Sequence, residues 1–471
     1  MPSPDQHADN QPAVSRLPFS VFAEDVLGHL FALHEEFGPV AAVEDQGLRL
    51  VLLFDPELNF QVLRDTETYQ GRFFPIRGPK RSSQRRLTCG LLGMNGEQHS
   101  RNRRILKDAF SLRAIAGYRP AVESITDRWI DSWQPGTTID LNEEMTRYML
   151  TVTSTLLFGM NDQQKACELG EQIADWAARM HEVGTGALVP DAAFDAGYEP
   201  LLAQAEELEK SVISMIAHRR ETIASQSEAC DVLSLLIRGH GELGKLNDEE
   251  LVGQACVLFG AAHMTTAHSL TWTLLLLSLH PQIAADLLAE SLLPEESQTG
   301  LIERVIKESM RVLPASAYSQ RVTGKRVTVG PYDCPPGTPV VFTPLVTHRL
   351  PSLYPEPRKF DPDRWRELKP SPYEYLPFGA GARMCVGGPL AMDILRHAIP
   401  RMLQGFRFDV PEGAEISAMV RGTMLAPVGD VPVQLNEADG QFTSHPIRGN
   451  LTTLLDLPGA AQANTRPRQP R

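Results

Sequence analysis

The sequence lacks the features that mark several common functional classes. It has no basic excess, because 58 Asp and Glu against 45 Lys and Arg give a formal net charge of −13, whereas nucleic-acid-binding proteins usually present a basic surface. Its six cysteines are widely scattered without a CxxC pair, a pattern typical of reduced thiols rather than of a disulfide framework. We therefore expect no nucleic-acid partner and a reducing, cytoplasmic compartment.

Long apolar segments are also missing. The longest apolar run, around Leu270–Leu279, is too short to span a bilayer. The polar N-terminus has no apolar core of a secretory signal. These absences predict a soluble protein without a membrane anchor.

The pattern along the chain predicts one folded domain, residues 18–435, between two polar ends. Residues 1–17 and 436–471 have the composition of flexible segments, although LTTLLDL in the tail could form one short helical turn. Between the ends the periodicity is mostly helical. Strand-like pieces occur early, at FGPVAAVEDQG and LRLVLLF, and later at KRVTVG, TPVVFTPL and VPVQL.

The longest predicted helix begins at Asn247, where Asn247 and Glu250 have the spacing of a capping box, and ends before Pro281. A helix of this length is expected to cross the whole domain. One of its faces carries small and polar side chains, namely Ala261, Ala262, Thr265, His268 and Ser269. Such a stripe on a buried helix would leave space for a flat ligand or a substrate.

A second feature is the stretch PFGAGARMCVGG, residues 377–388, in which glycines surround Cys385. Glycine is needed where the backbone turns tightly or approaches another body closely, and a helix pattern opens directly after the cysteine. Backbone N–H groups and the helix dipole would stabilise a thiolate there. A lone thiolate suits an iron already held by four other atoms, as in haem. The alternative is a buried core thiol at a Gly-rich turn.

These residues closely resemble the signature of the cytochrome P-450 superfamily, Phe-x-x-Gly-x-Arg-x-Cys-x-Gly. The matching positions are Phe378, Gly381, Arg383, Cys385 and Gly387. The resemblance implies haem b (iron protoporphyrin IX) with Cys385 as the axial iron ligand. It also implies that Phe378 packs near the sulfur, that Arg383 pairs with a propionate and that Gly387 lets the helix approach the porphyrin.

The resemblance covers roughly residues 18–435 and implies a fold. That fold is mainly α with a small β lobe, a single triangular prism with haem between the long helix and the cysteine loop. Three cations match the family's propionate-binding positions, namely His99, Arg103 and Arg321. Without the resemblance, His99 and Arg103 would read as one face of a solvated basic helix.

Glu308 and Arg311 lie at i and i+3 of a predicted helix, a spacing most often seen in surface ion pairs of little energetic value. The family carries a Glu-x-x-Arg helix whose partner arginine lies downstream, and Arg364 in FDPDRW matches that partner. By resemblance the three residues form a structural brace on the cysteine side of the haem rather than a catalytic group.

The long helix departs from the family at one position. In the segment AAHMTT, Thr265 takes the oxygen-activating position and Thr266 follows it, but Met264 stands where the family has an acid. A thioether cannot relay protons. Three routes remain open: ordered water, a polar group of the substrate, or His268 one turn away. A satisfied core histidine is the alternative interpretation of His268.

The resemblance implies a monooxygenase that inserts one oxygen atom of O2 into a hydrophobic small molecule by hydroxylation or epoxidation. Ala261, Ala262 and Met424 are expected to line the substrate pocket. No flavin- or iron–sulfur-binding segment is visible, so a separate ferredoxin and its NAD(P)H-dependent reductase are expected as electron donors. A cationic run at residues 101–107 could receive the ferredoxin.

The small, apolar pocket positions suggest a moderately large hydrophobic substrate. The soluble form and the resemblance to the family imply a bacterial-type enzyme of natural-product biosynthesis, and we expect a monomer. Two other functions stay open at this stage. Met264 leaves room for peroxide-driven or oxidative coupling and ring-forming chemistry. A non-catalytic haem sensor would fit the cysteine loop but not Thr265.

Overall fold

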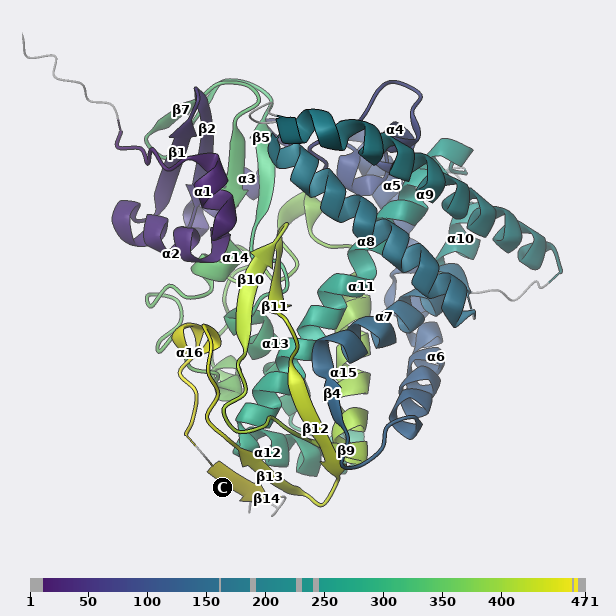
Figure 1. Cartoon of the computed structure of the whole chain (residues 1–471), viewed down its shortest axis with the longest axis vertical. Helices are drawn as coiled ribbons and strands as arrows, with labels where there is room; N and C mark the ends of the chain where they lie inside the picture. Colours follow the sequence, from purple (N-terminus) through teal and green to yellow (C-terminus); the bar gives the residue numbers. More distant parts are fainter. Residues whose placement is uncertain are drawn as a thin grey trace, which may run out of the picture.

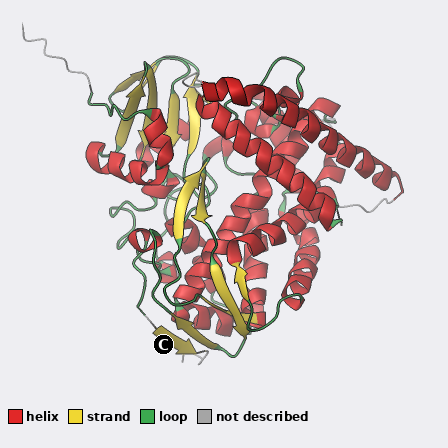
Figure 2. Ribbon diagram, in the orientation of Figure 1, coloured by secondary structure: helices red, strands yellow, loops and turns green. Residues whose placement is uncertain are grey.

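The structure is a computed structural model, and it describes residues 12–160, 162–186, 192–225, 231–239, 245–459 and 461–464. Helices make up most of it, and short strands gather along one side (Figure 2). The predicted mainly helical chain with a small β lobe is confirmed.

The helices differ widely in length, and the three longest are α8, α9 and α11. Their bounds are α1 Phe19–Glu24, α2 Val26–Phe37, α3 Pro56–Arg64, α4 Ser83–Leu87, α5 Gly96–Ala109, α6 Leu112–Asp131, α7 Leu141–Phe158, α8 Gln163–Gly186, α9 Ala192–Ser225, α10 Val232–Arg238, α11 Asp248–Leu279, α12 Pro281–Ser291, α13 Leu301–Val312, α14 Pro344–Thr347, α15 Gly388–Gly405 and α16 Leu451–Leu454.

The strands are short. Their bounds are β1 Val40–Asp45, β2 Leu48–Leu53, β3 Tyr69–Gln70, β4 Thr138–Asp140, β5 Ser319–Thr323, β6 Val327–Val329, β7 Tyr332–Cys334, β8 Pro339–Phe342, β9 Phe406–Asp409, β10 Ser417–Arg421, β11 Met424–Val428, β12 Pro432–Glu437, β13 Gln441–Ser444 and β14 Ala461–Asn464.

The β lobe is a five-stranded sheet of order β1-β2-β8-β5-β3. It lies at one corner of the molecule next to α1 and α2 (Figure 1). Strand β2 is parallel to β8, with Val51 opposite Val340, and antiparallel to β1. Because both of these residues are fully buried, the register is fixed by apolar packing.

Helix α11 is the structural centre of the molecule. The predicted capping box is present, since Asn247 Oδ1 accepts from the Glu250 N–H and Glu250 Oε2 accepts from the Asn247 N–H. The helix ends at Leu279 and α12 begins at Pro281, as the sequence predicted. Figure 1 shows α11 in the interior, with α8 and α9 side by side above it.

Among the described helices, no single one is long and apolar enough to cross a membrane. The pair α11 and α12 passes by length and composition when taken together, but the two helices are bent by 110° relative to each other.

The two ends of the chain differ from the sequence prediction. The Ser15 N–H donates to Ala42 O (2.8 Å) and Ser15 O accepts from the Glu44 N–H (2.9 Å), so this residue pairs with β1. At the other end Phe442 and Leu451 are buried in the main core. Residues 12–17 and 436–459 are thus attached to the folded body, where the sequence predicted flexible ends, and α16 lies at the predicted helical turn. Residues 1–11, 460 and 465–471 lie outside the described part.

Candidate active site

The loop before Cys385 is shaped by its glycines. Gly381 has φ +71°, and a Cβ there would lie 2.4 Å from Leu63 O, so only glycine lets the loop pack on α3. The Cys385 N–H donates to Phe378 O (2.8 Å), which closes the turn. Helix α15 then begins at Gly388. A Cβ on Gly388 would lie 3.2 Å from the Phe378 ring, whereas one on Gly387 would meet nothing nearer than 3.9 Å.

Neighbouring groups act on the pKa of the Cys385 thiol in opposite directions. Burial raises the pKa of its thiol above the usual value, while backbone N–H groups of Gly387 and Gly388 and the charge of Arg103 lower it. The side chain nevertheless has accessible surface. That combination is expected of a sulfur that borders an internal space. Because the opposing groups do not offset burial, a thiolate here needs a further positive charge, such as a metal ion.

Four basic residues from three segments gather here, and we call them the basic cluster: His99 and Arg103 of α5, Arg321 of β5 and Arg383 of the cysteine loop itself. Burial and the charges of the three arginines lower the pKa of His99 to about 4. Burial and the charge of Arg383 lower the pKa of Arg321 to about 10. No ion pair within the described residues neutralises the three arginines. The structure thus brings together the four residues that the sequence singled out for propionate binding.

Arg383 is held by contacts that sequence reasoning missed. Its Nη2 donates to Met94 O (2.6 Å) and to Asn95 Oδ1, and a Cβ on Gly71 would lie 2.3 Å from its Nη1. Its buried Nε has no hydrogen-bond partner among the described residues. Asn95 is the residue before α5, so these bonds connect the cysteine loop to the helix that carries His99.

Glu308, Arg311 and Arg364 also meet. Arg311 donates to both oxygens of Glu308 at 2.9 Å, and Arg364 Nε donates to Glu308 Oε1 at 2.8 Å. The side chains of Glu308 and Arg311 are both 0% exposed, so the alternative of a surface ion pair does not apply. Trp365 Nε1 also donates to Glu308 Oε2 at 2.9 Å, a contact that no sequence signal indicated.

Beyond its first turn, α11 is accessible only over a short stretch. Ala261 is exposed, and Ala262, Met264 and Thr265 are half-buried, within a helix that is otherwise almost entirely buried. The Thr265 hydroxyl donates to Ala261 O at 2.9 Å, which leaves its oxygen able to accept a hydrogen bond. The predicted stripe of small and polar side chains therefore borders a space at Ala261–Thr265.

Two predicted catalytic residues do not border this space. Thr266 is buried, and His268 is 2% exposed. Burial, together with the charges of His263 and Arg421, lowers the pKa of His268 to about 4. A buried, neutral imidazole whose Nδ1 has no hydrogen-bond partner among the described residues matches a core histidine better than a proton relay. The geometry leaves Thr265 as the candidate catalytic group.

Met424 lies at the start of β11 and forms a bridge with Ser316, just after α13. Trp272 of α11 donates through Nε1 to Leu425 O at 3.1 Å. The β10–β11 hairpin is thus attached both to α11 and to the segment after α13. Two of these segments, α11 and the hairpin, carry Ala261, Ala262 and Met424, the residues from which the sequence predicted pocket walls.

Comparisons with known proteins agree with this geometry. The family model described as Cytochrome P450 matches residues 11–431. The chain belongs to the cytochrome P450 family. Among curated relatives, cyclooctat-9-en-7-ol 5-monooxygenase of Streptomyces melanosporofaciens is 30% identical over 78% of this chain and 84% of its own. Cyclooctatin synthase of the same organism is 29% identical over 80% and 84%.

Solved cytochrome P450 structures share the fold. The haem domain of cytochrome P450DA superposes with a TM-score of 0.73 at 24% identity, covering 88% of this chain and 93% of that chain. CYP175A1 from Thermus thermophillus gives a TM-score of 0.69 at 26% identity, covering 89% and 97%. This cytochrome P450 is therefore a monooxygenase, and its family carries haem with a cysteine thiolate as the axial iron ligand.

The residues present fit that cofactor. Three arginines without a carboxylate partner, with His99 beside them, suit two buried propionates, because buried charges must be paired. No group of three or more His, Cys, Asp or Glu side chains in the described parts of the chain could hold a metal ion. A single cysteine, as in this cytochrome P450, suits only an iron that other atoms already hold.

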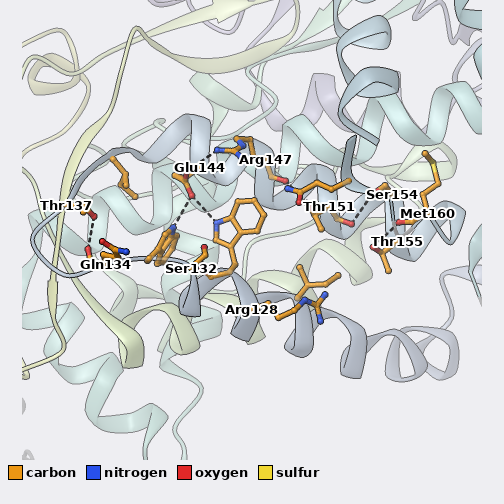
Figure 3. Close-up of a pocket in the computed structure, with 15 residues that line it drawn as sticks. Arg128, Ser132, Gln134, Thr137, Glu144, Arg147, Thr151, Ser154, Thr155 and Met160 are labelled. Atoms are coloured by element: carbon orange, nitrogen blue, oxygen red, sulfur yellow. Dashed lines mark hydrogen bonds and ion pairs between the residues drawn. The ribbon is translucent and has the colours of Figure 1, made fainter. Parts of the chain in front are cut away.

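A pocket of about 780 Å³ lies apart from these residues (Figure 3). It is formed by α6, α7, β4 and the turns beside them. Glu144 lies in its wall and accepts hydrogen bonds from the indoles of Trp129 (3.1 Å) and Trp133 (3.0 Å). None of the predicted site residues lines it, and its polar groups largely bond one another. We assign it no part in the haem site.

Proposed function

We propose that Cys385 is the axial ligand of the haem iron and that the chain inserts one atom of O2 into a hydrophobic natural product. The observation that carries the proposal is the basic cluster beside the cysteine loop, because its three unneutralised arginines call for an anionic ligand. When bound, the haem supplies the activation of O2 and the oxidising equivalents for oxygen insertion.

The roles of the protein groups follow from their contacts. The N–H groups of Gly387 and Gly388 point at the Cys385 sulfur and stabilise negative charge on it. On α11, the Thr265 hydroxyl would hold a proton at Oγ1 and pass it on. Because the neighbouring side chain of Met264 has no proton to give and His268 is buried, water or a polar group of the substrate supplies the protons that reach Thr265. Ala261 and Ala262 leave space for the substrate beside that hydroxyl.

The substrate class rests on the pocket and on the relatives. Ala261, Ala262 and Met424 offer an apolar wall. Two relatives are named for cyclooctat-9-en-7-ol oxidation and for cyclooctatin synthesis. These observations support a largely hydrocarbon substrate with few polar groups. Cyclooctat-9-en-7-ol is therefore the first probe to test.

Replacing Thr265 by Ala is expected to divert reducing equivalents from product to hydrogen peroxide. The fraction recovered in product should fall at least about tenfold, since a positioned proton donor contributes a factor of this size or larger. The measurement compares NADPH consumed, peroxide formed and product formed in the holoenzyme reconstituted with ferredoxin and its reductase.

The matched control is Thr271→Val. Thr271 makes the same hydroxyl-to-carbonyl bond within α11, to Ala267 O at 3.0 Å, on a fully buried face. It should leave the product fraction unchanged. Equal peroxide yields from Thr265→Ala and the unaltered protein would reject the proposed role. Product formed with hydrogen peroxide alone at the full rate would favour the peroxide-driven alternative.

We further propose that a ferredoxin docks on the outer face of α5 and the start of α6. Arg104, Lys107 and Arg113 are exposed there, and Leu112 is 81% exposed. The inner face of α5 carries His99 of the basic cluster. A local positive patch on a chain of net charge −13 can attract an acidic protein. Arg101 is not part of this patch, because it pairs with Glu250 at 3.2 Å and connects α5 to α11.

Reversing two charges tests this docking site. The double variant Arg104→Glu, Lys107→Glu should slow electron transfer from ferredoxin about tenfold at low salt and much less at high salt, because exposed charges are screened. Stopped-flow reduction of the haem by reduced ferredoxin measures it. Lys210→Glu, an exposed residue on α9, is the control. A rate unaffected by the double variant at low salt would contradict the site.

The compartment and assembly are proposals of the same kind. We expect a monomer in the cytoplasm, and the scattered cysteines without a CxxC pair support the reducing compartment. Sedimentation of the purified holoenzyme at about its chain mass of 52.1 kDa is the corresponding observation.

A further inference from the structure

The C-terminal segment lies beyond the part of the chain that matches the family, which ends at residue 431. We call residues 446–456 the C-terminal clip. They follow β13 and include α16. Figure 1 shows α16 beside β10, next to the hairpin that reaches α11. The clip contacts two separate parts of the molecule, the hairpin and the segment beside the Glu308 brace.

The first contact is with the strand that leads into the hairpin. The Ile416 N–H donates to Arg448 O at 2.9 Å, and the Arg448 N–H donates to Ala414 O at 2.8 Å. The Asn450 side chain then completes the ladder. Its Oδ1 accepts from the Ala418 N–H at 2.7 Å, and its Nδ2 donates to Ala418 O at 2.8 Å. An amide side chain thus satisfies both backbone groups of a residue within β10.

The second contact is with the segment that holds the brace. The Asp456 N–H donates to Arg358 O at 3.0 Å, and the two side chains pair at 3.1 Å. Arg358 Nη2 also donates to Thr452 O at 3.2 Å. The next residue, Lys359, accepts through its carbonyl from Arg311 at 2.9 Å. The clip therefore contacts the hairpin at its start. At its end it bonds Arg358, the residue next to Lys359 of the Glu308 network.

The clip is also seated in the core. Leu451, Leu454 and Leu455 are buried and belong to the main apolar cluster. Three buried leucines within five residues fix α16 against the body of the protein, since removing apolar surface from water drives such packing. The contacts with β10 are therefore made by an anchored segment.

The hairpin needs such a partner. Strands β10 and β11 form a sheet of two strands only, and an isolated two-stranded hairpin is marginally stable in water. On the β11 side, the Ala317 N–H donates to Thr423 O at 2.9 Å and the Leu425 N–H donates to Ala315 O at 3.1 Å. The outer edge of β10 has Asn450 in place of a further strand, which covers the unpaired backbone groups.

We propose that the C-terminal clip sets the position of Met424 beside α11 and so determines which substrates the pocket accepts. Asn450 is the positioning residue, because it fixes β10 without touching the pocket itself. The inference rests on the proposed role of Met424 in the substrate pocket. It assigns a specificity function to a segment outside the family match.

Two variants test the clip without altering the hairpin. Asn450→Ala removes both bonds to Ala418. Gly449→Ala acts through the backbone, since Gly449 has φ +94° and a Cβ there would lie 2.3 Å from Ile416 O. Thr453→Ala is the control for the first, because Thr453 is exposed on the same short helix and its hydroxyl donates to the backbone carbonyl of Asn450 (2.7 Å) rather than to β10. Gly429→Ala is the control for the second, with φ +68° and nothing within 4 Å.

The first measurement is amide hydrogen exchange of the holoenzyme over residues 418–428. Both variants should speed exchange about tenfold across the hairpin, the effect of losing one or two hydrogen bonds. The second is the ratio of dissociation constants for 4-phenylimidazole and imidazole, read from the haem absorbance. This ratio should change at least about fivefold, because only the larger ligand reaches the pocket wall. The controls should change neither.

Unchanged amide exchange in both variants would overturn the proposed role of the clip. Faster exchange with an unchanged ratio of dissociation constants would also overturn it. A change in thermal stability alone, with the ratio preserved, also counts against it. Failure of the proposed function looks different. Neither imidazole would then perturb an absorbance band of the chain, while the exchange measurement would still report on the clip.

Discussion

The variant Cys385→Ser is expected to lose oxygen-inserting activity by about a thousandfold or more while keeping its fold. A serine hydroxyl is not ionised near neutral pH and cannot supply the electron density that a thiolate gives to iron. The loop should survive, because its closing bond uses the backbone N–H of residue 385. The carbon monoxide spectrum of the reduced protein should lose its red-shifted, thiolate-type band.

A matched variant separates ligation from thiol chemistry in general. Cys167 is a half-buried free thiol on α8, and Cys167→Ser should retain both the spectrum and the activity. Circular dichroism of both variants checks the fold. A red-shifted band that persists in Cys385→Ser would show that another residue holds the iron, and the assignment of the site would fail with it.

Local signals were enough to predict the elements around the site. The capping box at Asn247 and the break at Pro281 gave the bounds of α11 to within a residue, because both act on the backbone within one turn. The C-terminal clip could not be predicted in this way. Its apolar residues, such as Leu451, stand in a polar tail, and their partners around Ala414 and Arg358 lie far away in the sequence.

The candidate site likewise contains residues that the sequence indicated and residues that only the folded structure identifies. The glycine-rich loop and the spaced basic residues were visible because their residue types and spacing carry the chemistry. Asn95 and Trp365, which bond Arg383 and Glu308, gave no such signal, since an amide or indole N–H is needed there only once the fold has formed. The close approach of the helix to the porphyrin at Gly387 stays a prediction, whereas the packing of Gly388 against Phe378, where a Cβ would lie 3.2 Å from the ring, was not predicted.

The variant Glu308→Ala is expected to lower the free energy of unfolding by about 3–5 kcal/mol, the usual cost of removing one partner from a buried ion pair. The carboxylate accepts from Arg311, Arg364, Trp365 and the Asp361 N–H. Its loss leaves the guanidinium of Arg311, which is 0% exposed, without an opposite charge. Urea unfolding followed by tryptophan fluorescence measures the change.

The same helix offers a matched control. Glu303 pairs with Lys307 at 2.9 Å on the outer face of α13, where both side chains are about 40% exposed. Glu303→Ala should cost less than about 1 kcal/mol, because exposed pairs gain little in water and are screened by salt. Glu303 also lies 3.5 Å from Arg396, so the two glutamates, each paired at helical spacing on one helix, differ in burial and in their additional donors. Similar losses in both variants would show that the brace stabilises the protein no more than a surface pair does, and the Glu308 network would have to be explained by something other than stability.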